Sequence, residues 1–166
     1  MTLNEGELVE FLASDLEASG HLTFREVTLT RSLLDMAALG DTPVQKRIDL
    51  AALNKYDGQI LFLEAEREFT VKHPLSYRPF ADFTYLVAPM TAYREVPEQV
   101  RQEQVTWAQA EGLGIILVEG DGRSEVLVSA KRNPQLSPEV RGAVRAMMRV
   151  QDPLSTTYPP MPPFTQ

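Results

Sequence analysis

Carboxylates at the end of one predicted strand could build a site for a divalent cation. Glu64 and Glu66 close the segment 59–66 (QILFLEAE). Because side chains alternate along a strand, both acids share a face with Ile60 and Phe62, at the rim of an apolar surface. An unpaired carboxylate there is costly, so its presence favours a function such as metal binding.

Asp49 is expected to meet these acids from the neighbouring strand. It lies near the start of the segment 48–53, and the turn at 54–58 carries the Asp-Gly signal of a hairpin. Counting outward from this turn places Asp49 opposite Glu64 in an antiparallel pair. Glu26, in the strand before, could add a further acid at the same edge. Such oxygens suit Mg²⁺ or Mn²⁺, which can activate water and neutralise charge on a phosphodiester.

The composition restricts the choice of metal. The chain of 166 residues contains no cysteine and only two histidines, His21 and His73. Cysteine zinc sites, thiolate nucleophiles and a three-histidine zinc site are therefore excluded. A metal would have mainly oxygen ligands, which favours Mg²⁺ or Mn²⁺ over zinc.

The elements that position these residues alternate between helices and strands. The length favours one α/β domain over 1–150 and a proline-rich tail over 151–166. We expect a mixed β-sheet flanked by helices, in the order helix, three-strand meander, further strand, helix, hairpin, helix. The predicted helices cover about 4–19, 98–111 and 137–150, with a short apolar helix or loop in 30–46; the predicted strands cover 24–29, 48–53, 59–66, 83–88, 114–118 and 125–129.

Several of these segments together resemble the PD-(D/E)xK restriction-endonuclease-like superfamily, and within it the small bacterial MmcB-related DNA-repair proteins. The resemblance covers about residues 24–130. It rests on EVTL from Glu26, RIDLAAL from Arg47, GQILFLEAE from Gly58, Tyr77, FTYLVA from Phe83 and GLGIILVEGDGRSEVL from Gly112. It implies the restriction-endonuclease-like fold and metal-dependent hydrolysis of DNA, with a role in DNA repair.

The resemblance also implies roles for single residues. Asp49 and Glu64 match the two metal-binding acids, and Glu26 matches an upstream glutamate. The lysine that would follow the second acid by two residues falls on Glu66, and the family uses it to orient or activate the attacking water. Lys72 could stand in for it, or Glu66 could bind a second metal instead. The alternative is a catalytically inactive nuclease fold that binds nucleic acid or protein.

Each candidate also has an ordinary structural interpretation. Asp49, Glu64 and Glu66 could be surface acids at a solvated sheet edge, and Glu66 could pair with Arg47. Glu26 is more readily explained as structural. His73, beside Pro74 in an irregular segment, is more readily explained as a surface or packing residue, and we assign it no site.

The charge distribution bears on possible partners. The formal net charge of −7 argues against a simple polybasic nucleic-acid binder. Arg141, Arg145 and Arg149 nevertheless recur every four residues on the last predicted helix, a spacing that could grip a phosphate backbone. Such a row is more often a solvated face or the partner of an acidic surface. An acidic N-terminus and the lack of an apolar span predict a cytoplasmic protein without a membrane partner; a homodimer is possible.

Overall fold

The structure of the protein is a computed structural model that describes residues 2–30 and 46–151. The segment expected as a short helix or loop lies almost entirely outside the described residues, and so does the proline-rich tail from 152 onward. In chain order the elements are α1 (Glu5–Ala18), β1 (His21–Leu29), β2 (Lys46–Asn54), β3 (Ile60–Ala65), α3 (Lys72–Leu75), the 3₁₀ turn η1 (Arg78–Phe80), β4 (Phe83–Pro89), α4 (Met90–Glu95), α5 (Glu98–Glu111), β5 (Gly114–Val118), β6 (Ser124–Val128) and α6 (Pro138–Gln151).

The described strands form one mixed sheet in which spatial order equals chain order, β1 to β6. The meander β1–β2–β3 is antiparallel, β4 and β5 run parallel to β3, and β6 returns antiparallel to β5. The predicted α/β class with a mixed sheet and flanking helices is therefore confirmed. The short helix α4 was not predicted, and β1 begins three residues earlier than expected.

The β2–β3 hairpin has the predicted register. Leu53 lies opposite Ile60, and the ladder continues to the pair Leu50 and Leu63. The turn between the strands contains Gly58 with a φ of 73°, a conformation that glycine adopts without steric penalty. One step further along this register Asp49 faces Glu64, which brings together the two acids of the candidate site.

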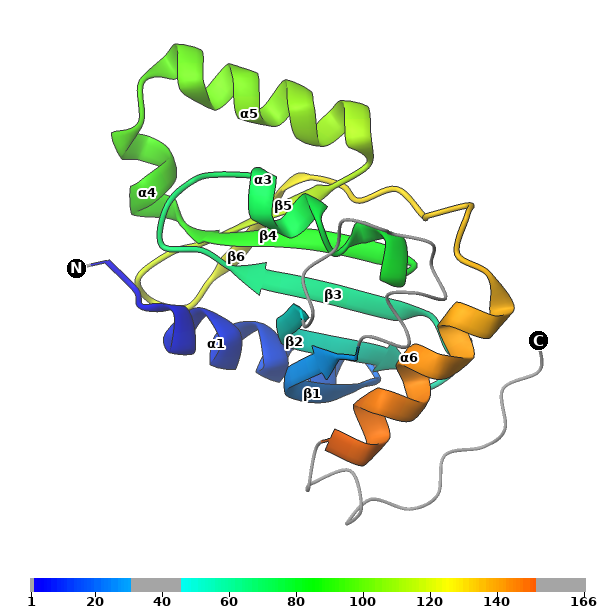
Figure 1. Ribbon diagram of the computed structural model, residues 1–166. Coiled ribbons are helices and arrows are strands. Elements are labelled where there is room, and N and C mark those ends of the chain that lie inside the picture. Colours follow the sequence, from blue (N-terminus) through cyan, green and yellow to red (C-terminus); the bar gives the residue numbers. More distant parts are fainter. Residues whose placement is uncertain (1, 31–45, 152–166) are drawn as a thin grey trace.

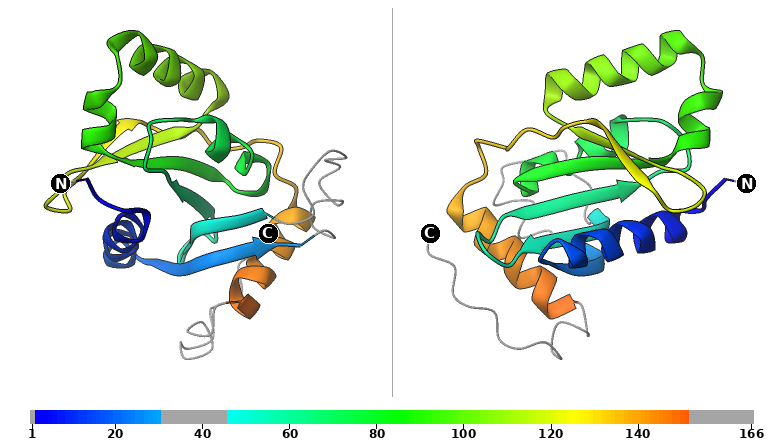
Figure 2. Two further views of the ribbon diagram at one scale, coloured as in Figure 1. Left: turned by 60° about the vertical axis from the view of Figure 1, so that its left-hand side comes forward. Right: turned by 180° about the vertical axis from the view of Figure 1, so that it is seen from behind.

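Helix α1 covers one face of the sheet, as Figures 1 and 2 show. It begins with a capping box, in which the Asn4 side chain accepts from the Glu7 N–H while the Glu7 carboxylate accepts from the Asn4 N–H. Leu8 and Leu12 are buried against β2 and β3. Burial of this stripe fixes α1 against the strands that carry the candidate acids.

Two apolar clusters lie on the opposite face of the sheet. The first contains Phe62 of β3 and the buried side of α6, and the second contains Leu86 of β4 together with residues of α5 and β5. Glu64 follows Phe62 on the same side of β3 and lies directly across from Leu86 in the parallel ladder. Its carboxylate therefore lies where the two clusters meet. The neighbouring positions on this face are apolar.

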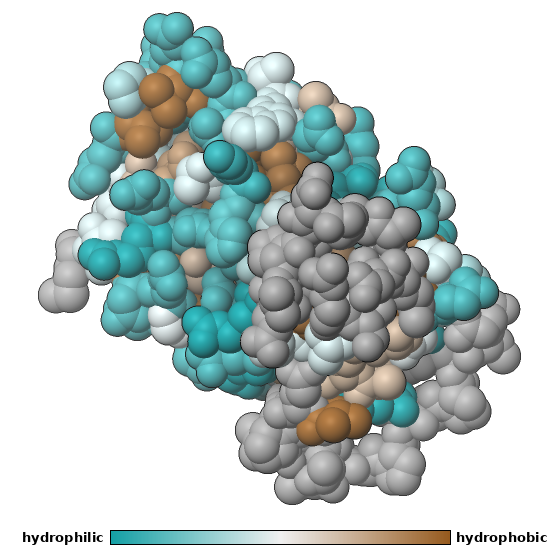
Figure 3. Space-filling model, in the orientation of Figure 1, coloured by the Kyte–Doolittle hydropathy of each residue, from teal (hydrophilic) through white to brown (hydrophobic). Residues whose placement is uncertain are grey.

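The surface in the orientation of Figure 1 is largely hydrophilic. Apolar residues form small separate patches there, over α5 and towards the end of α6 (Figure 3). Within the described ranges, no helix has the length and apolar character needed to cross a bilayer.

Candidate metal centre

Asp49 and Glu64 are joined through the backbone at the point where the β2–β3 ladder ends. The Asp49 N–H donates to Glu64 Oε1 at 2.9 Å, and the Ala65 N–H donates to Asp49 Oδ2 at 2.9 Å. Each carboxylate thus takes the place of a main-chain carbonyl in the pairing. One oxygen of each side chain is held by this bond, which fixes the orientation of the other.

An irregularity in β1 lies beside Asp49. Glu26 has a φ of 55°, an uncommon conformation for a residue with a side chain. Phe24 and Val27 point into the same apolar cluster although they are three residues apart, so the alternation along β1 changes at Glu26. Regular pairing with β2 is interrupted between Arg25 and Val27, opposite Asp49. Such backbone strain tends to gather at functional sites.

Glu64 is a buried acid, with 1% of the residue exposed. Burial, followed by the negative charge of Asp49, raises the pKa of Glu64 to about 9. Burial also raises the pKa of Asp49, and the charge of Glu66 adds to this rise. The protein thus holds a carboxyl group that is neutral at pH 7 unless a cation compensates for its charge.

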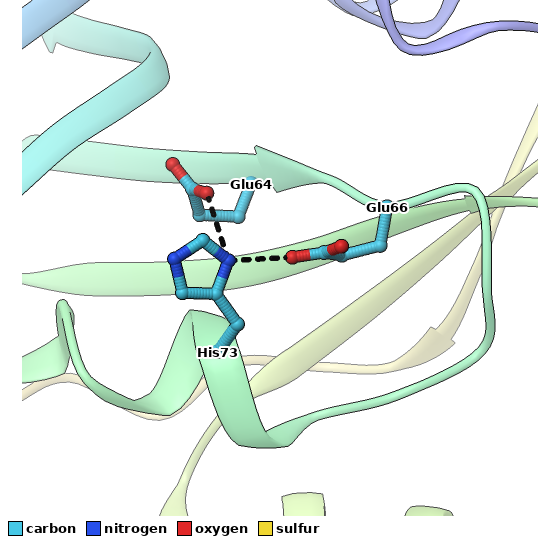
Figure 4. A group of neighbouring side chains, drawn as sticks. All are labelled: Glu64, Glu66 and His73. Atoms are coloured by element: carbon cyan, nitrogen blue, oxygen red, sulfur yellow. Dashed lines mark hydrogen bonds and ion pairs between the residues drawn. The ribbon is translucent and has the colours of Figure 1, made fainter.

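His73 faces the two glutamates from α3, as Figure 4 shows. Its Nδ1 lies 2.7 Å from Glu66 Oε1 and 3.7 Å from Glu64 Oε2. One possible ligand atom from each of the three residues lies within 4.8 Å of the others. This spacing allows one ion to contact all three side chains.

Tyr77 holds the other side of the His73 ring. The Tyr77 hydroxyl lies 3.1 Å from His73 Nε2 and donates to the Arg47 carbonyl oxygen at 2.9 Å. Tyr77 is buried, and the surrounding acids Glu64 and Asp49 act with burial to raise its pKa above the ordinary tyrosine value. The hydroxyl therefore stays protonated near neutral pH.

The remaining predicted site residues are placed differently. Glu26 does not belong to the cluster; its side chain is exposed and lies 4.0 Å from Arg47. Glu66 pairs with His73 rather than with Arg47, and Asp49 lies beside Glu64 without entering the 4.8 Å group. Lys72 is exposed, and within the described ranges it makes no hydrogen bond or ion pair with the acids. No contact therefore supports the interpretation that Lys72 stands in for the motif lysine.

The arginines of α6 have partners within the protein. Arg141 donates to the buried Asp82 at 2.7 Å, and Arg145 donates to the Gly58 carbonyl at 2.7 Å. Arg149 is exposed and also takes part in an interaction. Arg141 therefore has an acidic partner, as the alternative from the sequence allows, and this partner is the buried Asp82. Because Arg141 and Arg145 are held by these contacts within the protein, we do not propose them as nucleic-acid ligands.

A groove of about 710 Å³ opens between α1 and the first two strands, and it reaches Asp49. Five carboxylates and two guanidinium groups line it, so its charge is negative. These charged residues are Glu5, Glu7, Glu10, Glu26, Asp49, Arg25 and Arg47. Two exposed basic residues lie on the α3 side instead, where Arg67 follows Glu66 and Lys72 precedes His73.

The donor set fits a divalent cation. Glu64 and Glu66 offer carboxylate oxygens, Asp49 adds negative charge beside Glu64, and His73 offers a ring nitrogen. Sequence reasoning missed His73 because neighbouring Pro74 marks the segment as irregular. The one available signal was the spacing of His73 and Tyr77, four residues apart, with Tyr77 already among the residues of the family resemblance.

Comparison of the sequence with protein-family models gives no match, and neither does comparison with curated proteins.

Proposed function

We propose that the protein is a metal-dependent phosphodiesterase of the restriction-endonuclease-like kind that acts on DNA. The observation that carries this proposal is the convergence of Asp49, Glu64 and Glu66 at one place, with Glu64 buried between two apolar clusters. The element order supports it, because a helix, a three-strand meander and further strands in one mixed sheet are what the resemblance implies.

Glu64 and Glu66 would hold the cation, and Asp49 would orient Glu64 through its backbone N–H. When bound, the ion would lower the pKa of a water and offset the charge that develops on the phosphate. A cation would also replace the proton that burial otherwise keeps on Glu64. The two backbone hydrogen bonds limit side-chain motion, so the oxygens are positioned before the ion arrives.

The DNA backbone would be held by exposed basic residues next to the acids. Arg67 and Lys72 are both exposed and bracket the loop that joins Glu66 to His73. Guanidinium and ammonium groups bind phosphate without regard to sequence. This placement gives Lys72 a role in binding rather than in activation of water.

One observation favours a second candidate, a nuclease fold that binds nucleic acid or protein without hydrolysis. Glu66 occupies the position where the resemblance implies a lysine, and it is hydrogen-bonded to His73. A carboxylate does not supply the positive charge of that lysine. Binding of DNA without turnover would identify this candidate.

Nicking of supercoiled plasmid tests the proposal. We expect the wild type to nick DNA with Mn²⁺ or Mg²⁺ and to lose this activity with EDTA. Glu64→Gln should abolish nicking and Asp49→Asn should reduce it through loss of the negative charge beside Glu64, whereas Glu68→Gln, at an exposed acid two residues after Glu66, should retain it. Absence of nicking by the wild type with either ion, on duplex, single-stranded and nicked DNA, would overturn the hydrolytic function.

A further inference from the structure

We infer that His73 is a metal ligand through Nδ1, that Tyr77 holds it in the required tautomer, and that the site therefore takes a divalent transition-metal ion in preference to Mg²⁺. The inference deepens the proposed function, on which it rests for the place of the site. It departs from the expectation of an all-oxygen ligand set.

The first step concerns the proton of Tyr77. A phenol has one proton, and here it is donated to the Arg47 carbonyl oxygen at 2.9 Å. Towards His73 Nε2, 3.1 Å away, the hydroxyl oxygen can then only accept. The hydrogen-bond network thus assigns the His73 proton to Nε2.

The second step concerns the opposite side of the ring. With its proton on Nε2, neutral His73 presents a lone pair at Nδ1, 2.7 Å from Glu66 Oε1 and 3.7 Å from Glu64 Oε2. Three possible ligand atoms therefore converge on one point, as Figure 4 shows. One cation placed among them would contact all three atoms and compensate for the charge of the two carboxylates.

A proton could be this cation, but it would contact only part of the cluster. A proton on Nδ1 would bridge to Glu66 Oε1, whereas Glu64 Oε2 lies beyond hydrogen-bond distance. Within the described ranges no hydrogen-bond donor reaches that oxygen, although only 2% of the Glu64 side chain is exposed. A metal ion can contact all three atoms at once.

The ligand set selects the metal. Imidazole nitrogen favours first-row transition metals, whereas Mg²⁺ prefers oxygen ligands and keeps much of its water shell. A ligating histidine that donates its other N–H to an oxygen is the usual arrangement around such ions. In this protein the oxygen that accepts from the other N–H of His73 belongs to the Tyr77 hydroxyl, which the Arg47 carbonyl holds in place.

Titration calorimetry on the EDTA-treated full chain without a histidine tag tests the inference, with Co²⁺ and Mg²⁺ as the probes. We expect one Co²⁺ site, with visible absorption that reports nitrogen ligation. His73→Ala should weaken Co²⁺ binding by about 100-fold or more and leave Mg²⁺ affinity nearly unchanged, whereas Tyr77→Phe should weaken Co²⁺ binding by about 10-fold.

Matched controls come from the same chain. His21→Ala removes the other histidine, and Tyr56→Phe changes a tyrosine that is 85% exposed; neither should alter Co²⁺ affinity. His73 is exposed, so His73→Ala is expected to fold, and circular dichroism checks this. Equal Co²⁺ affinity of wild type and His73→Ala, or no Co²⁺ binding at all, would overturn the inference.

The outcomes separate this inference from the proposed hydrolysis. If Co²⁺ binding depends on His73 but no metal supports DNA nicking, the ligand assignment stands and the hydrolytic function fails. If Mg²⁺ supports nicking equally in wild type and His73→Ala, and Co²⁺ does not bind, the function stands and the ligand assignment fails.

Discussion

The backbone N–H of Asp49 donates to the buried side chain of Glu64, 2.9 Å away, where the β2–β3 ladder of main-chain pairs ends. This bond makes the position of the Glu64 carboxylate a consequence of the hairpin register. Because the Ala65 N–H donates in turn to Asp49, the two acids orient each other. The β-sheet therefore sets the position of Glu64 within the proposed cation site.

Glu64→Gln is predicted to separate folding from metal binding. The amide oxygen can still accept from the Asp49 N–H, and the Glu64 carboxyl group is already neutral at pH 7 with its pKa near 9. Below about pH 4.5, where Glu64 is protonated in both the folded and the unfolded chain, we expect the free energy of unfolding in urea to change by less than about 1 kcal/mol. Glu64→Ala, which leaves a cavity and an unpaired N–H, should lose about 2–4 kcal/mol. Equal losses in the two variants would contradict this description of the site.

The stability of the metal-free protein is predicted to fall as the pH rises. The pKa of Glu64 is raised from 4.5 to about 9 in the folded state, so between these values the folded chain binds more protons than the unfolded chain. The contribution of Glu64 is complete below about pH 4.5 and is lost as the pH approaches 9. The slope is at most about 1.4 kcal/mol per pH unit.

The measurement for this pH dependence is urea denaturation at several pH values between 5 and 8.5, with Glu64→Gln as the reference. Subtraction of the two curves removes the other titrating groups. The difference should decline with pH, and this decline should vanish when a saturating divalent cation keeps Glu64 ionised in the folded chain. A constant difference across this range would show that Glu64 ionises normally.

Local signals predicted most of the fold. The Asn4 and Glu7 capping box, the Asp57-Gly58 turn and Gly112 after α5 mark ends of elements through backbone chemistry that neighbouring residues decide. The pairing of Asp49 with Glu64 followed from strand register, because a two-residue periodicity leaves few alternatives. The restriction-endonuclease-like arrangement itself stays a prediction.

Long-range contacts account for what the sequence did not predict. The helical spacing of Arg141 and Arg145 was correctly recognised, but Asp82, the partner of Arg141, is 59 residues away in the chain. His73 reaches Glu66 because α3 folds back over the end of β3, and no local pattern encodes that return (Figure 4). Glu26 was expected near the acids; its exposed side chain lines the same groove as Asp49 but lies outside the group of Glu64, Glu66 and His73.

The Asp82–Arg141 pair is predicted to support folding rather than DNA binding. Asp82 is fully buried and also accepts from the Ile60 N–H at 2.8 Å. Asp82→Asn leaves the Arg141 charge without its counterion and should lower the free energy of unfolding by about 3–5 kcal/mol. Asp121→Asn, at an exposed acid that pairs with Arg123, should leave it nearly unchanged. Similar changes in the free energy of unfolding in the two variants would show that the buried pair contributes no more to stability than the exposed pair.

Arg67 and Lys72 are predicted to contribute to DNA affinity through phosphate contacts. The double variant Arg67→Gln/Lys72→Gln should reduce the slope of log K against log salt concentration by about 2, as expected for two lost contacts with duplex DNA. Fluorescence anisotropy with a labelled duplex over a range of salt concentrations measures this slope. Arg123→Gln, in the β5–β6 turn, is the control. An unchanged slope in the double variant would place the DNA surface elsewhere.

The most direct test of the cation site is anomalous X-ray scattering from a crystal soaked in MnCl₂, measured at the manganese absorption edge. Our account predicts an anomalous peak in contact with the carboxylates of Glu64 and Glu66 and with Nδ1 of His73. Absence of a peak there, with manganese only at exposed acids or nowhere, would contradict it.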